Sequence, residues 1–97
     1  MKNQFVTVAA VQNSVSEDMQ VNLKKTLRLV EKAAKAGAKI ICLQELYGTI
    51  YFPQYKKVNK DKYAETIPGE STKAFQTLAK KYGVVIIVPV FEKRKCF

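Results

Sequence analysis

The chain has 97 residues, of which 47% are hydrophobic and 26% are charged, and its formal net charge is +9. This length favours one domain, and this balance of residues excludes the intrinsically disordered class. No apolar run approaches the ~18 residues that cross a bilayer. The N-terminal "MKNQFVTVAAVQNS" lacks a continuous signal-like core. We therefore expect a cytoplasmic protein that does not span a membrane.

The positive charge raises the question of a nucleic-acid partner, because clustered cations gain affinity by releasing counterions from phosphates. Here the cations are dispersed, and many fall on the expected outer faces of helices: Lys24, Lys25, Arg28, Lys32, Lys35, Lys73, Lys80 and Lys81. A solvated surface explains this pattern better than a binding stripe does. We expect no nucleic acid, although a basic α/β binding module stays open as an alternative.

Two cysteines and the absence of histidine limit the available chemistry. Neither a disulfide framework nor a metal-ligand cluster is indicated, and Ser-His and Cys-His catalysis are excluded. We expect reduced thiols, no metal and no cofactor. Cys42 lies inside an apolar run and is predicted to be a core side chain.

The first half of the chain predicts a strand, a helix and a second strand. Residues 5–11, "FVTVAAV", indicate a buried strand. "SEDMQ" then supplies acceptors for a helix start, apolar residues recur at helical spacing, and Gly37 is typical of a left-handed cap. Residues 38–44, "AKIICLQ", predict the second strand. This order requires a parallel pair with a right-handed crossover, and parallel strands are typically buried on both faces.

The second half continues with an irregular segment over residues 46–69, a helix that begins near Ser71 and ends at Gly83, and a strand over residues 84–91 that contains Pro89. The whole chain, residues 1–97, is thus expected to form one β-α-β-α-β unit of the α/β class. The amino-acid sequence itself contains no internal repeat.

Three parallel strands bring their carboxyl ends to one edge, and open α/β sheets bind ligands outside that edge. The residues that follow the strands are Gln12 and Asn13, then Gln44 and Glu45, then residues 92–94. The loop after Glu45 is long enough to form a lid or a pocket wall. Glu45 itself is either a solvated carboxylate or a general base that Tyr47, Tyr51 and Phe52 shield from water.

Several segments resemble the carbon-nitrogen hydrolases, the nitrilase superfamily. They are "VAAVQN", "NLKKTLRLVEKAAKAGAKIICLQEL", "YFPQ", "IPGEST" and "AKKYGVVIIVPVFEKR". Within the superfamily, "LQELYGTIYFPQ" and "VPVFEKR" are most similar to the N-carbamoylputrescine amidases, which are related to the β-ureidopropionases. This resemblance implies the N-terminal portion of an α/β/β/α sandwich that commonly forms homo-oligomers.

The resemblance also implies a thiol amidase with a Glu-Lys-Cys triad that hydrolyses a small-molecule N-carbamoyl amine. N-carbamoylputrescine would give putrescine, ammonia and carbon dioxide, a step of polyamine biosynthesis. Glu45 matches the family's glutamate, the general base. The family's lysine and cysteine lie beyond the third strand, and no position here matches them. Lys93, Lys95 and Cys96 are not expected to replace them, so the chain alone is expected to be inactive.

Tyr51 and Phe52 have two equally weighted interpretations, a pocket wall for an aliphatic substrate or anchors of the long loop. Three strands also leave unpaired edges and helix-free sheet faces, so self-association is a further possibility. A different amidase of the superfamily, such as a β-ureidopropionase, stays open as well.

Overall fold

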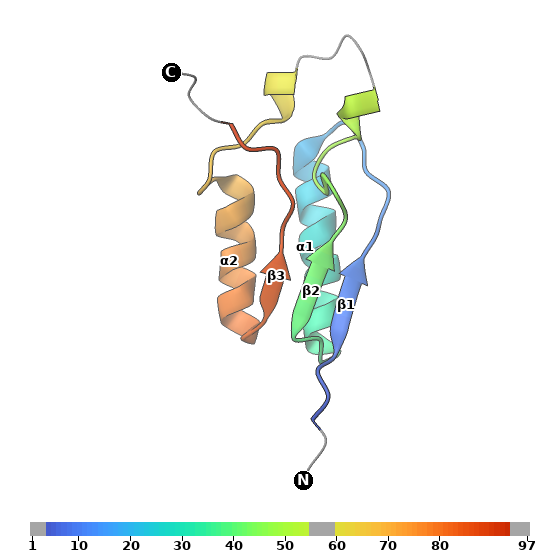
Figure 1. Ribbon diagram of the computed structural model, residues 1–97, viewed down its shortest axis with the longest axis vertical. Coiled ribbons are helices and arrows are strands. Elements are labelled where there is room, and N and C mark those ends of the chain that lie inside the picture. The colour runs from blue at the N-terminus through green and yellow to red at the C-terminus, as the bar shows by residue number, and fades with distance from the viewer. Residues whose placement is uncertain (1–3, 55–59, 94–97) are drawn as a thin grey trace.

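The computed structural model describes residues 4–54 and 60–93. In these residues the strands of one parallel sheet alternate with two helices along the chain, as Figure 1 shows. The elements are β1 (Val8–Val11), α1 (Met19–Lys35), β2 (Ile40–Leu43), α2 (Glu70–Tyr82) and β3 (Val85–Ile87). Two short 3₁₀ turns, Phe52–Gln54 and Lys60–Tyr63, lie in the long segment before α2. The expected β-α-β-α-β order of the α/β class is confirmed.

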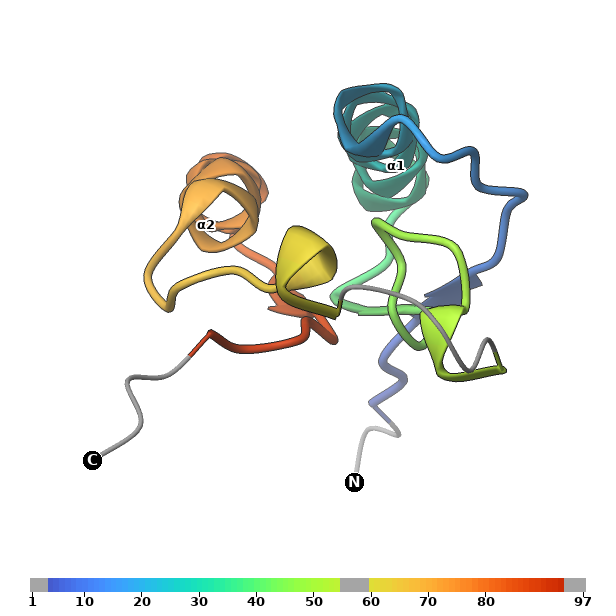
Figure 2. The ribbon, with the colours of Figure 1, turned by 90° about the horizontal axis from the view of Figure 1, so that it is seen from above.

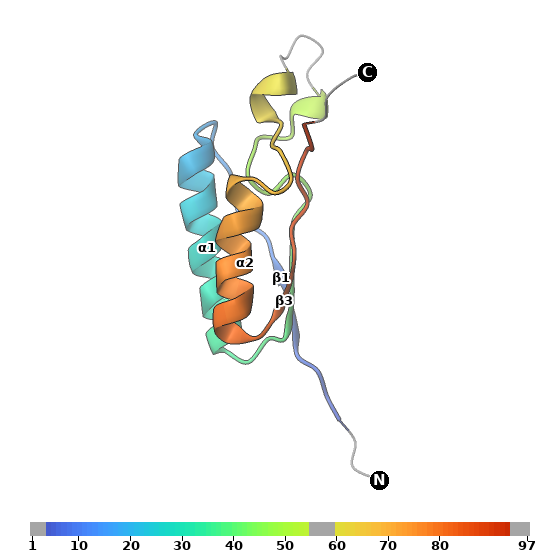
Figure 3. The ribbon, with the colours of Figure 1, turned by 90° about the vertical axis from the view of Figure 1, so that its left-hand side faces the viewer.

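The sheet has the strand order β1-β2-β3, and both pairs are parallel. Val8 is in register with Ile40, which is in register with Val85. Right-handed crossovers that advance in one direction along a sheet place their helices on the same face. Figures 2 and 3 show this result, since α1 and α2 lie side by side on one face of the sheet. This is one helical layer on one sheet.

Helix α1 begins where the sequence supplies a cap. The Asp18 carboxylate accepts hydrogen bonds from the backbone N–H groups of Gln20 (3.0 Å) and Val21 (3.2 Å), which satisfies donors that have no partner within the helix. Its buried residues, Asn22, Leu23, Thr26 and Val30, form one stripe. Gly37 follows the helix with a φ of 104°, a conformation that favours glycine.

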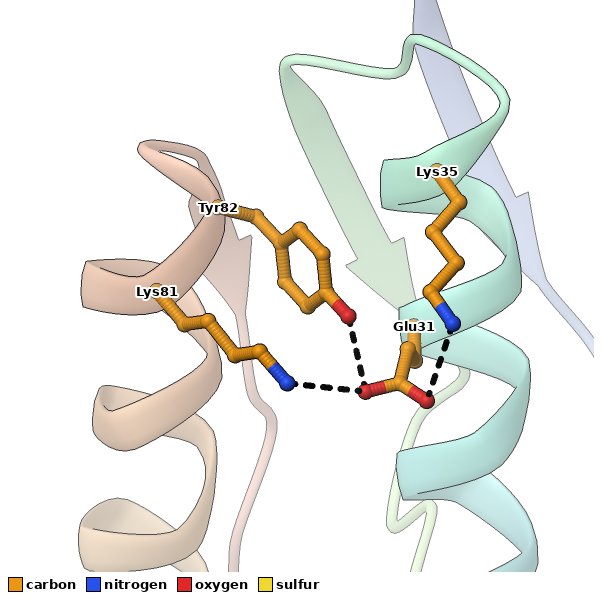
Figure 4. Close-up of polar contacts among 4 residues, drawn as sticks. All are labelled: Glu31, Lys35, Lys81 and Tyr82. Atoms are coloured by element: carbon orange, nitrogen blue, oxygen red, sulfur yellow. Dashed lines mark hydrogen bonds and ion pairs between the residues drawn. The ribbon is translucent and has the colours of Figure 1, made fainter.

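Two sets of side-chain contacts hold α1 and α2 together. At their N-terminal ends, the Gln20 amide donates to the Glu70 carboxylate at 2.6 Å. At their C-terminal ends, the Tyr82 hydroxyl donates to Glu31 at 2.8 Å (Figure 4). Lys35 and Lys81 flank the same carboxylate at 3.7 and 3.8 Å. The Tyr82 hydrogen bond and the nearby Lys35 lower the pKa of Glu31.

The strands are shorter than the sequence predicts. Residues 5–7 precede β1, whose register with β2 begins at Val8 and Ile40, and Phe5 is 90% exposed. Strand β3 ends at Ile87, two residues before Pro89, which has no N–H to donate to a sheet. Apolar composition alone therefore overestimates the length of the paired segments.

The expectation that the strands are buried on both faces is wrong for this chain. In β2, Ile41 is fully buried and Leu43 is 4% exposed, whereas Ile40 is 37% exposed. Cys42 is also exposed, so its predicted place in the core is wrong. The cause is topological, since both helices cover the same face (Figure 3). The core lies between that face and the helices, where Val30, Ile41 and Phe75 pack with their neighbours. No helix in the described ranges, 4–54 and 60–93, is long and apolar enough to span a membrane.

Candidate active site at the carboxyl edge of the sheet

The carboxyl ends of the strands lie at one edge, as predicted, because both strand pairs are parallel. The segments that follow β1 and β2 are in direct contact. The backbone N–H of Asn13 donates to the Gln44 side-chain oxygen at 2.8 Å. The residue before Glu45 is therefore fixed to the end of the neighbouring strand.

Glu45 is the second residue after β2, and it lies in a turn at this edge with its side chain exposed. In the part of the chain that the structure describes, its carboxylate makes no hydrogen bond or ion pair. Of the two interpretations, this exposure fits the solvated carboxylate rather than a base that Tyr47, Tyr51 and Phe52 shield from water. The position of Glu45 matches the prediction, whereas its role as a general base stays a prediction.

Tyr51 and Phe52 have different surroundings although they are adjacent. The Phe52 ring is 2% exposed, stacks on Tyr63 with 4.9 Å between centroids, and meets the edge of Phe91 at 5.1 Å. Its contacts are those of an anchor that holds the long loop against the segment after β3. Tyr51 is 48% exposed, so its ring is the one of the two that a ligand can reach.

Tyr47 enters a buried hydrogen-bond chain that the sequence did not reveal. Its ring is 2% exposed and meets the edge of Phe75 at 5.3 Å, and its hydroxyl bonds to that of Ser71. The Ser71 hydroxyl donates to one oxygen of Glu65 at 2.7 Å, and the Ser71 N–H donates to the other at 3.0 Å. The sequence indicates Ser71 only as the start of a helix, and no sequence signal marks Glu65.

The environment of Tyr47 favours its neutral form. Burial raises the pKa of Tyr47 to about 12, and the nearby carboxylates of Glu65 and Glu70 act in the same direction. The hydrogen bond to Ser71 lowers the pKa but does not outweigh burial. Tyr47 therefore remains a hydrogen-bond donor at neutral pH.

A cleft of about 360 Å³ lies beside this chain of hydrogen bonds. Its walls include Tyr47, Gly48, Glu65, Ser71 and Lys93, but not Glu45. Of the lysines and the cysteine considered as substitutes for the triad, Lys93 is exposed, while Lys95 and Cys96 lie outside the described residues. Within the described ranges, no group of three or more His, Cys, Asp or Glu residues is arranged to hold a metal ion.

Comparisons with known proteins agree with this geometry. The family model described as carbon-nitrogen hydrolase matches residues 7–96. An N-carbamoylputrescine amidase from Solanum lycopersicum is 43% identical over 95% of this chain and 31% of its own length. The omega-amidase NIT2-B from Xenopus laevis is 40% identical over 82% of the chain and 28% of its own length.

A solved structure extends the similarity to three dimensions. The crystal structure of a carbon-nitrogen hydrolase from Helicobacter pylori G27 superposes with a TM-score of 0.81 and 28% identity, over 93% of this chain and 31% of that one. The chain thus spans about a third of the length of the proteins it matches.

Proposed function

The chain belongs to the carbon-nitrogen hydrolase family, and from this premise we propose that it supplies the glutamate-bearing part of an amidohydrolase for linear N-carbamoyl amines such as N-carbamoylputrescine. The observation that carries the proposal is the place of Glu45, at the carboxyl edge of a parallel sheet in a chain of this family. Ligand sites of open α/β sheets lie at this edge.

The choice of substrate follows from the similar proteins. N-carbamoylputrescine amidases from two Solanum species are 43% and 42% identical over 95% of the chain. A β-ureidopropionase from Arabidopsis thaliana is 33% identical over 96% of it. We therefore place N-carbamoylputrescine first and treat ω-amides and β-ureidopropionate as the alternatives to test.

In the proposed mechanism, Glu45 accepts the proton of a cysteine thiol that another segment of the complete enzyme supplies. The thiolate attacks the carbamoyl carbon, and a lysine stabilises the tetrahedral oxyanion. Ammonia leaves, and water then cleaves the bond between sulfur and the carbamoyl carbon, which restores the thiol and releases N-carboxyputrescine. This carbamic acid loses carbon dioxide as its C–N bond breaks, so that one water and one substrate give putrescine, ammonia and carbon dioxide. We include assembly of the complete enzyme as a homo-oligomer in this proposal.

A general base works best when it is partly desolvated, because its pKa then approaches neutrality. Glu45 is exposed in this chain. The proposal therefore requires that other segments of the complete enzyme cover the edge of the sheet around Glu45. The nucleophile and the lysine would arrive on the same segments.

The experiment joins residues 1–93 to the part of the tomato relative that follows the matched region and measures ammonia release from N-carbamoylputrescine. We expect turnover by this hybrid and none by the 97-residue chain alone. Glu45→Gln is expected to lower the rate at least ~100-fold, whereas Glu17→Gln, which changes another exposed carboxylate, should leave it unchanged.

An inactive hybrid would contradict the proposal, and so would two further outcomes. Undiminished turnover by the Glu45→Gln hybrid would remove the general base from the mechanism. Turnover by the free chain that survives Cys42→Ser together with Cys96→Ser would contradict the thiol mechanism. Faster hydrolysis of an ω-amide or β-ureidopropionate by the hybrid would reassign the substrate.

A further inference from the structure

The turn that carries Glu45 is held in an unfavourable backbone conformation. Leu46 has a φ of 50°, and it is the one non-glycine residue with a positive φ in the described part of the chain. This left-handed conformation is unfavourable for an L-residue, so neighbouring contacts must stabilise it. One contact closes the turn itself, since the Thr49 N–H donates to the Leu46 carbonyl at 3.1 Å.

A second set of contacts comes from Tyr47, the next residue. Its buried ring packs against Phe75 of α2, and its hydroxyl meets that of Ser71 in the first turn of the same helix. The side chain that follows the strained residue is therefore fixed at both its ring and its hydroxyl. Glu45 and Tyr47 are separated by one residue, so fixing Tyr47 restricts where Glu45 lies.

The hydrogen bonds that join Tyr47, Ser71 and Glu65 have a defined direction. The Glu65 carboxylate accepts from both the hydroxyl and the N–H of Ser71. Since the single Ser71 proton is used in that bond, the Tyr47 hydroxyl donates to Ser71 rather than accepting from it. Tyr47, Ser71 and Glu65 thus form a hydrogen-bond relay that ends on a carboxylate. A hydrogen bond to a carboxylate is stronger than one between neutral groups.

Glu65 is in turn fixed by its main chain to the segment after β3. Its N–H donates to the Phe91 carbonyl at 2.8 Å, and its carbonyl accepts from the Lys93 N–H at 2.6 Å. The relay therefore joins the turn after β2 to the segment after β3, across the first turn of α2. Three side chains therefore connect the turn after β2 with residues that follow β3.

We infer that Tyr47, Ser71 and Glu65 are positioning residues for Glu45, which rests on the proposed function of Glu45 as the general base. In this role they act through the strained turn. Proton transfer needs a base within hydrogen-bond reach of its partner, so a small displacement of the turn lowers the rate without weakening substrate binding.

The first test follows the turn in the 97-residue chain by amide hydrogen exchange at Thr49. Tyr47→Phe removes the hydroxyl and keeps the ring, and Ser71→Ala removes the acceptor while leaving Tyr47 in place. Each variant should exchange about two- to tenfold faster at Thr49. Tyr82→Phe is the matched control, because it removes a tyrosine–glutamate hydrogen bond at the opposite end of the helices. Unchanged exchange in both variants, or an equal increase in Tyr82→Phe, would overturn the inference.

The second test measures hydrolysis by the hybrid enzyme. Tyr47→Phe should lower kcat by on the order of ten- to a hundredfold with little change in KM, whereas Tyr82→Phe should change neither. An active hybrid in which Tyr47→Phe leaves kcat intact would overturn the inference. An inactive unmodified hybrid would count against the proposed function, and the exchange experiment would still decide whether the relay fixes the turn.

Discussion

Ile40 and Ile41 are neighbours in β2 and lie on opposite faces of the sheet. Ile41 is fully buried in the core under the helices, whereas Ile40 is 37% exposed, because successive side chains of a strand point to opposite faces. The same contrast extends along the sheet, because Val8, Val85 and Ile87 are 66%, 58% and 49% exposed. The two faces have similar side chains but different surroundings. Topology, rather than composition, therefore decides which apolar residues form the core.

The largest expected effect is a loss of stability, and comparing one substitution on each face tests the contrast between the two faces. Ile41→Ala should lower the free energy of unfolding by about 2–5 kcal/mol, because it leaves a cavity in a packed core. Ile40→Ala should cost less, about 1–2 kcal/mol, since 37% of this residue is already exposed and its loss leaves no enclosed cavity. Urea unfolding of both variants gives the comparison. Equal losses would mean that the second face is also covered in solution, as the self-association hypothesis requires.

The sequence predicted the fold well because its strongest signals are local. Caps, helical periodicity and the two glycines after the helices placed α1 and α2 within a few residues, and the short connections required parallel strands. It did not predict which face would be open. Residues 39–43, "KIICL", contain no polar alternation, so the exposure of Cys42 follows only from both helices lying on one side.

The candidate site was predictable in position but not in detail. Glu45 lies at the edge because strand ends of a parallel sheet meet there. The bond between Tyr47 and Ser71 joins residues 24 apart, and its existence depends on the path of the loop between them. Tyr51 and Phe52 are adjacent, yet the loop turns one outward and buries the other. No spacing rule describes such irregular backbone.

The next effect concerns Tyr47, on the helix-covered side. Its pKa is about 12 in the folded chain against 10 for an unburied tyrosine. As the pH rises, the hydroxyl of Tyr47 therefore loses its proton first in the unfolded chain. Its contribution to the free energy of unfolding is fully present below pH 10 and is lost between pH 10 and about 12. The loss amounts to up to about 3 kcal/mol.

Urea unfolding at pH 8 and at pH 11.5 measures this loss, with Tyr47→Phe as the control. The variant has no proton to lose at this position, so its stability should fall less over the same interval. Equal alkaline losses in the two proteins would show that the Tyr47 hydroxyl is accessible to water in the folded chain, against its 2% exposure.

The smallest expected change in stability lies on the open face. Cys42 is exposed, so Cys42→Ser should alter the free energy of unfolding by no more than about 0.5 kcal/mol. In a Cys96→Ser background, Cys42 should react with a chromogenic disulfide reagent nearly as fast in the folded chain as in urea. The control is Val11→Cys in a chain that lacks Cys42 and Cys96, which puts the thiol on the covered face. Because Val11 is 8% exposed, this thiol should react far more slowly. Protection of Cys42 at high chain concentration would mean that a second copy covers the open face. Protection at every concentration would contradict the assignment of the two faces, because residues 4–54 and 60–93 include no other layer that could shield that thiol.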